Sequence, residues 1–230
     1  MSHRGKRRGS HKMLIYIAGV CHDDPKGKAN LTAWLHKLSA AHRGPPAFVG
    51  VEYDKDKFAD LKQQRPLLRQ KMESYGPAAS PDVLDALADC LAYEPDAVAD
   101  VFPNLEPLWL DTGTSLATTS LYNRLGSIYQ DRLELKKVVF PAETTTVLAL
   151  MSEAAWETFE RQGAQASCPR DEKFARLVLE KIEQVSGGWA IVIVGANHAT
   201  PTPGSMRSRL TAPGIDCEVD LIKPNGPVPA

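Results

Sequence analysis

The stretch WAIVIVGA, residues 189–196, decides the fold of this chain, and the polar pair Asn197-His198 follows it directly. Its apolar residues run on without alternation, which predicts a strand buried on both faces, as in a parallel sheet covered by helices. Runs of the same kind occur at 14–20 (LIYIAGV) and 47–52 (AFVGVE). Two further strands are predicted: a short one at 107–111 (PLWLD) and an alternating edge strand at 217–222 (CEVDLI).

Helical patterns separate these strands. The expected helices cover 30–42, 56–74 with a break or kink at Pro66, a segment that starts at Ser80-Pro81-Asp82, 142–162, and 170–185 closed by Gly187-Gly188. This order predicts one α/β domain over 13–230, with a mainly parallel central sheet flanked by helices. A helical insertion is expected at 75–165, and a basic flexible tail at 1–12.

Length and composition exclude several classes of protein. The 230 residues are 43% hydrophobic and 24% charged, the range of ordinary globular domains rather than of disordered, fibrous or disulfide-stapled chains. No run approaches the ~18 consecutive apolar residues of a membrane span. The first residues also lack the apolar segment and cleavage site of a secretory signal peptide.

The charge is distributed unevenly. The tail holds five basic residues and no acid, so of 27 basic residues 22 remain in the body, against 28 acidic residues. An acidic body argues against a nucleic-acid-binding face, which needs clustered Lys and Arg. Only the tail offers a place for RNA or an anionic surface.

The cysteine pattern bears on location. The four cysteines have no close pair among them, which predicts reduced thiols in a cytoplasmic protein: Cys21, Cys90, Cys168 and Cys217.

Ligand-type side chains follow the three most apolar strands. The run at 14–20 leads to His22, the run at 47–52 ends in Glu52 and leads to Asp54, and the run at 189–196 leads to His198. The carboxyl ends of parallel strands meet at one edge of a sheet, so these side chains are expected to converge. Imidazole and carboxylate together suit Zn²⁺, Mn²⁺, Co²⁺ or Fe²⁺, and a metal so held would lower the pKa of bound water to ~7.

A second polar pair, Arg170-Asp171, stands at the start of a predicted helix. Asp171 suits the first turn because its charge is favourable to the helix dipole, and Arg170 could clamp an anionic or carbonyl group. No Walker loop, GxGxxG, HExxH or GxSxG motif is present.

Four motifs in this order resemble the TraB/TIKI superfamily, with its ChaN-like and erythromycin-esterase-like relatives. They are GVCH at 19–22 followed by Pro25, VGVEYD at 49–54, RDEKFA at 170–175, and VGANH at 194–198. The match departs from the family at Phe174, where methionine is more usual, and at Cys21 inside the first GxxH. Residues 75–165 contribute no motif.

The resemblance implies an α/β fold and a metal-dependent peptidase site that uses Mn²⁺ or Co²⁺. It implies that His22, Glu52 and His198 are ligands or acid/base groups and that Arg170 is the polarising cation. It further implies that Asp171 orients Arg170 or reaches the metal.

The leading hypothesis is a metal-dependent hydrolase that attacks a peptide or ester-like bond with metal-bound water. Glu52 or a GxxH histidine would be the general base, and Arg170 would stabilise the oxyanion. The alternative is a non-catalytic protein that binds a peptide, a tetrapyrrole or another small ligand in the same place. A thiol enzyme built on Cys21 and His22 is disfavoured, because adjacent residues of an extended segment point to opposite faces.

Overall fold

The computed structural model describes residues 13–22, 24–74, 81–90, 92–111, 144–162 and 169–229. The strands are β1 (Met13–Val20), β2 (Val49–Val51), β3 (Leu108–Trp109), β4 (Gly188–Gly195), β5 (Asp216–Lys223) and β6 (Gly226–Pro229). The helices are α1 (Gly27–Ala41), α2 (Lys55–Glu73), α3 (Pro81–Asp89), α4 (Glu94–Val101), α6 (Thr144–Gln162), α7 (Pro169–Gln184), α8 (Ala196–Ala199) and α9 (Met206–Thr211). The predicted tail at 1–12, Ser80, Cys168 and the first residues of the helix expected at 142–162 lie outside the described residues.

The strands form one sheet in the order β3-β2-β4-β1-β5-β6. Every pairing among β1 to β5 is parallel, and β6 runs antiparallel to β5. The predicted α/β fold with a mainly parallel sheet is therefore confirmed.

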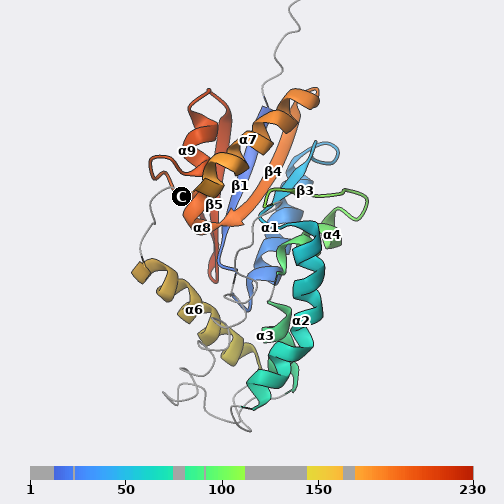
Figure 1. Ribbon diagram of the computed structural model, residues 1–230, viewed down its shortest axis with the longest axis vertical. Coiled ribbons are helices and arrows are strands. Elements are labelled where there is room, and N and C mark those ends of the chain that lie inside the picture. Colours follow the sequence, from blue (N-terminus) through green and yellow to red (C-terminus); the bar gives the residue numbers. More distant parts are fainter. Residues whose placement is uncertain are drawn as a thin grey trace, which may run out of the picture.

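Helices cover both faces of the sheet (Figure 1). On one face, strand residues such as Ile191 and Ile193 pack against α1 and α4, through Leu35 and Val98. On the other face, the intervening strand residues pack against α7 and α9: Ile15, Ile17, Val192 and Val194 meet Phe174, Val178, Met206 and Leu210. Burial on both faces explains the unbroken apolar runs of the sequence.

A separate group of helices, α2, α3 and α6, lies beyond the carboxyl edge of the sheet, where α8 follows β4 (Figure 1). Its core contains Leu68 and Met72 of α2, Leu87 of α3 and Met151 of α6. The α6 helix also contacts the β1–α1 turn, because Ser152 Oγ and Trp156 Nε1 both donate to the buried carboxylate of Asp24. The expected helical middle is thus present in its described parts, although it includes the short strand β3.

One local expectation is wrong: the strand expected at the edge over 217–222 is β5, but β6 pairs outside it among the described strands. Of the break or kink expected at Pro66, a break is absent, because α2 continues through this residue. Proline removes one N–H from the helix, and the buried face of α2, which includes Leu61 and Leu68, is anchored on both sides of it.

No helix in the described part of the chain is both long and apolar enough to cross a membrane.

Truncating a core side chain should cost far more stability than truncating the same residue type at the surface. We expect Leu35→Ala to lower the free energy of unfolding by about 2–5 kcal/mol, since Leu35 is fully buried between α1 and the sheet. The matched change Leu67→Ala, at a side chain that is 55% exposed, should stay within about 0.5 kcal/mol. Urea unfolding measures both values, and equal losses would contradict the packing of α1.

Candidate functional site

The sheet brings the predicted motifs to one edge. Val20 at the end of β1 is in register with Gly195 at the end of β4, and Val51 at the end of β2 is in register with Ile193. The residues that follow these strands include His22, Glu52 and His198, and they meet there as the sequence predicts. We call the charged side chains that gather at this edge the site cluster: His22, Glu52, Glu94, Asp111, Arg170, Asp171 and His198.

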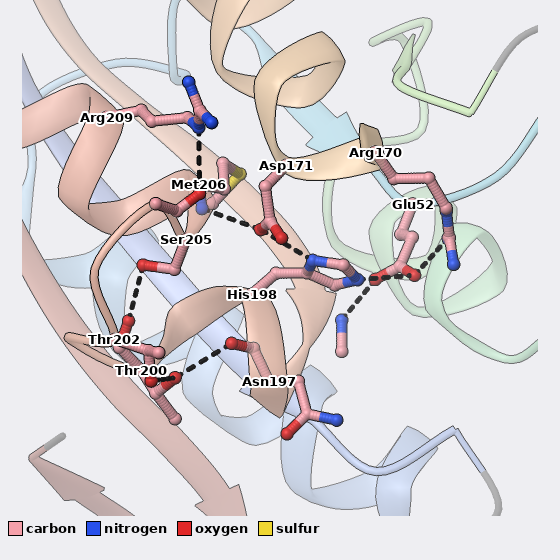
Figure 2. A network of polar contacts seen from close by, with 12 residues as sticks. Glu52, Arg170, Asp171, Asn197, His198, Thr200, Thr202, Ser205, Met206 and Arg209 are labelled. Atoms are coloured by element: carbon pink, nitrogen blue, oxygen red, sulfur yellow. Dashed lines mark hydrogen bonds and ion pairs between the residues drawn. The ribbon is translucent and has the colours of Figure 1, made fainter. Parts of the chain in front are cut away.

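Glu52 stands at the centre of the site cluster, with only 7% of its surface exposed. Its Oε1 accepts a hydrogen bond from Arg170 Nη2 and lies 3.3 Å from His198 Nε2 (Figure 2). Its Oε2 accepts from the backbone N–H of Gly195 at 2.5 Å and lies 3.5 Å from His22 Nε2. Both predicted histidines therefore turn the same ring nitrogen to one carboxylate.

Each histidine holds a second carboxylate at its other ring nitrogen. His198 Nδ1 lies 2.8 Å from Asp171 Oδ1, which also accepts the backbone N–H of Met206 at 2.7 Å (Figure 2). His22 Nδ1 lies 2.5 Å from Oε1 of Glu94, the first residue of α4, and 3.3 Å from the hydroxyl of Tyr53. Both rings are consequently fixed between two acceptors.

Arg170, at the start of α7, is held on several sides. Besides its bond to Glu52, its Nη2 lies 3.3 Å from Asp111 Oδ2, just beyond β3. The guanidinium carbon lies 5.2 Å from the ring centroid of Phe174, one turn along the helix, which is cation–π distance. The helix α7 thus delivers both Arg170 and Asp171 to the cluster, as the family resemblance implies for this pair.

The charges raise and lower one another's pKa values. Burial opposes the charge on His22, but Glu94 and Glu52 outweigh burial and raise the pKa of His22 to about 10. Burial likewise opposes the charge on His198, and Glu52 and Asp171 raise its pKa to about 10. Burial favours the neutral acid at Glu52, yet the two histidines hold its pKa well below the ordinary 4.5. At neutral pH the cluster contains two imidazolium ions beside a carboxylate.

Gly195 leaves no room for a side chain. A Cβ built on it would lie 2.9 Å from His22 Nε2 and 3.2 Å from Glu52 Oε2. Glycine at this place lets the backbone N–H approach the Glu52 carboxylate closely.

The side chains of the site cluster are poorly placed to bind the metal ion that the family resemblance implies. In the described part of the chain, no group of three or more His, Cys, Asp and Glu side chains is placed to hold a metal ion. The Glu52 oxygens already accept from Arg170 and Gly195, and both histidine Nε2 atoms lie within 3.5 Å of this same carboxylate. The residues as arranged do not fit a metal ion, and we derive no step through one.

Asp54 has a different task from the ligand role considered for it. Its carboxylate is the N-cap of α2 and accepts the backbone N–H groups of Asp56 and Lys57, at 3.0 and 3.4 Å. A capping aspartate at a helix start is a common reason for this residue type, independent of any metal.

Sequence reasoning missed three contacts of the cluster, those of Tyr53, Glu94 and Asp111. Tyr53 and Asp111 follow the predicted strands β2 and β3, so their place at the sheet edge was a usable signal. Glu94 precedes Pro95 at a helix start, where an acid is ordinary, and its sequence position carries no sign of burial.

Comparison of the chain with protein-family models, with curated proteins and with solved structures finds no match. The resemblance to the TraB/TIKI superfamily therefore stays a prediction from four short motifs.

Adding a methyl group at Gly195 should separate the central residues without unfolding the protein. We expect Gly195→Ala to displace His22 and Glu52, since the φ of −54° at Gly195 suits alanine but the added Cβ meets both side chains. NMR signals of the His22 ring should shift, with a loss of about 1–3 kcal/mol in stability. The control is Gly50→Ala, where the nearest atom would lie at an ordinary 3.4 Å. Equal shifts of the His22 signals in both variants would contradict the described packing.

Stability should fall as the pH rises from neutral to alkaline. Both histidines have a folded-state pKa of about 10, above the unfolded value of 6.5. Their contribution is fully present below pH 6.5 and is lost as the pH rises through about 10. Urea unfolding across this range should show the decline in wild type and in the control His36→Ala, which changes an exposed histidine. A decline of the same size in His22→Ala/His198→Ala would assign it to other groups.

Proposed function

We propose that this chain is a hydrolase of a peptide or ester-like bond, and that the site cluster carries out the reaction. One observation carries the proposal: two histidines far apart in the sequence both place Nε2 within 3.5 Å of the same buried carboxylate. Each ring is held at its other nitrogen by a further carboxylate. Paired imidazole and carboxylate groups beside an arginine are suited to acid–base acyl transfer.

The side chains that solvent reaches are the donors. Arg170 is 24% and His22 22% exposed, whereas Glu52, Glu94, Asp111 and Asp171 are each 8% exposed or less. An approaching substrate would meet N–H donors first, which favours binding through a carbonyl oxygen. Arg170 remains charged at every relevant pH and would stabilise the negative charge that develops on that oxygen.

Glu52 and His22 can divide the proton transfers between them. Glu52 is deprotonated at neutral pH and would take a proton from the water that attacks the carbonyl carbon. His22 is protonated and would give the Nε2 proton to the leaving nitrogen or oxygen as the scissile bond breaks. The proton on Glu52 would then return to His22 Nε2, 3.5 Å away, and restore the starting state.

The resemblance to the TraB/TIKI superfamily supports a hydrolase and implies a divalent metal, although the residues as arranged do not fit one. Supplying Mn²⁺, Co²⁺ or Zn²⁺ in the assay tests whether activity depends on a metal. The cysteine spacing of the sequence, which offers no close pair, supports a cytoplasmic location.

Removing the charge of Glu52 should abolish most hydrolysis. We expect Glu52→Gln to lower kcat/KM by about 10²–10⁴-fold, because the amide cannot accept the proton of water. The assay uses a panel of fluorogenic peptides and nitrophenyl esters, with and without added metal, on metal-stripped protein. The control is Glu106→Gln, which changes an exposed glutamate paired with Lys55 and should retain full activity.

The outcomes of this assay distinguish the candidate functions. Activity in metal-free protein that Glu52→Gln removes would support acid–base hydrolysis. Activity that appears only with a metal would contradict hydrolysis by these residues alone and would support the metal dependence that the resemblance implies. No turnover of any probe, with or without metal, would favour the non-catalytic ligand-binding protein.

A further inference from the structure

The residues at the start of α4 hold the turn that carries His22. The Tyr93 hydroxyl donates to the backbone carbonyl of Cys21 at 3.2 Å, and Glu94 Oε1 lies 2.5 Å from His22 Nδ1. Both Tyr93 and Glu94 are only 1% exposed. The Tyr93 ring also lies against Gly27 at the start of α1, where a Cβ would come within 2.3 Å of it. Tyr93 therefore holds the backbone of this turn, and Glu94 holds the imidazole ring of His22.

The backbone just before this contact is strained. Ala92 has a φ of +57°, and it is the one described residue other than glycine with a positive φ. The left-handed conformation costs a residue with a Cβ roughly 1–2 kcal/mol. Ala92 is fully buried and directly precedes Tyr93 and Glu94. Such strain persists where surrounding contacts demand it, and here the contacts of Tyr93 with Cys21 and of Glu94 with His22 follow directly.

The buried carboxylate of Glu94 also lowers the stability of the fold. Its second oxygen, Oε2, is buried and has no hydrogen-bond partner among the described residues. A buried carboxylate with one unpaired oxygen is unfavourable for stability. A residue chosen for stability alone would be apolar here, and the contact of the carboxylate with the ring of His22, beside the Tyr53 hydroxyl, is what the polar side chain provides.

We propose that Glu94 is a positioning residue that keeps a proton on His22 Nδ1 and so presents Nε2 to Glu52. A carboxylate only accepts, so the ring nitrogen beside it must donate. Asp171 holds His198 in the same way, with Nδ1 at the carboxylate and Nε2 at Glu52. The catalytic consequence of this orientation rests on the proposed function, whereas the position of the proton does not.

The test follows the ring protons directly. NMR of ¹⁵N-histidine-labelled protein, with the signals of His22 assigned through His22→Gln, reports which ring nitrogen carries a proton. Wild type should keep a proton on Nδ1 whether the ring is charged or neutral. In Glu94→Leu, which removes the acceptor, the neutral ring should carry its proton on Nε2 instead, facing Glu52. Retention of the Nδ1 proton by folded Glu94→Leu would overturn the proposal.

Three further variants keep the test decisive. Glu94→Gln offers an amide oxygen as acceptor, so Nδ1 should stay protonated there, and loss of its proton would count against the proposal. Asp171→Asn serves as the reciprocal control and should alter the signals of His198 but leave the proton on His22 Nδ1. If Glu94→Leu does not fold, Glu94→Ala in the presence of formate replaces it: formate should restore the Nδ1 proton, and failure to do so overturns the proposal.

Kinetics add a readout that separates this inference from the hydrolase proposal. If the chain hydrolyses any probe, Glu94→Leu should lower kcat about 10–100-fold with little change in KM, the usual effect of losing an orienting carboxylate. An unchanged kcat would overturn the catalytic consequence. If no probe is hydrolysed, the NMR result still decides whether Glu94 positions His22.

Discussion

The buried carboxylate of Glu52 is the constraint on which the arrangement of this molecule depends. A charge taken out of water costs several kcal/mol unless partners surround it. Here the partners are the backbone of Gly195 at the end of β4, His198 just after it, His22 after β1, and Arg170 from α7. The sheet order, with β4 between β2 and β1, is what allows these groups to reach one carboxylate.

Each cation around Glu52 is stabilised by a further acidic side chain. Glu94, Asp111 and Asp171 stand behind His22, Arg170 and His198, so charges alternate outward from Glu52. The helices α4 and α7 supply two of these acids while their apolar sides pack on opposite faces of the sheet. Packing of the core and the geometry of the site are therefore coupled, because a shift of either helix would move a charge.

The site residues that follow strands could be predicted from the sequence. Those that a helix from another part of the chain brings to the site could not. The apolar run at 189–196 and the GxxH ends are local patterns, and they place His22, Glu52 and His198 correctly at one edge. Glu94 reaches the site only because α4 packs against α1 and β2, which no local pattern encodes. Asp54 shows a different limit of sequence prediction. A carboxylate just after a strand suits either a metal ligand or a helix N-cap, and the sequence does not distinguish them.

The two edges of the sheet have a consequence for association between molecules. An open edge strand is a template on which another chain can add, and long flat edges invite aggregation. Among the described strands, one edge is β3, only two residues long, and the other is β6, whose four residues include Pro227 and Pro229. Proline has no N–H to offer a neighbouring strand. The described edge strands β3 and β6 are therefore poor templates for strand addition by another molecule, whereas the carboxyl ends of the strands carry the site cluster.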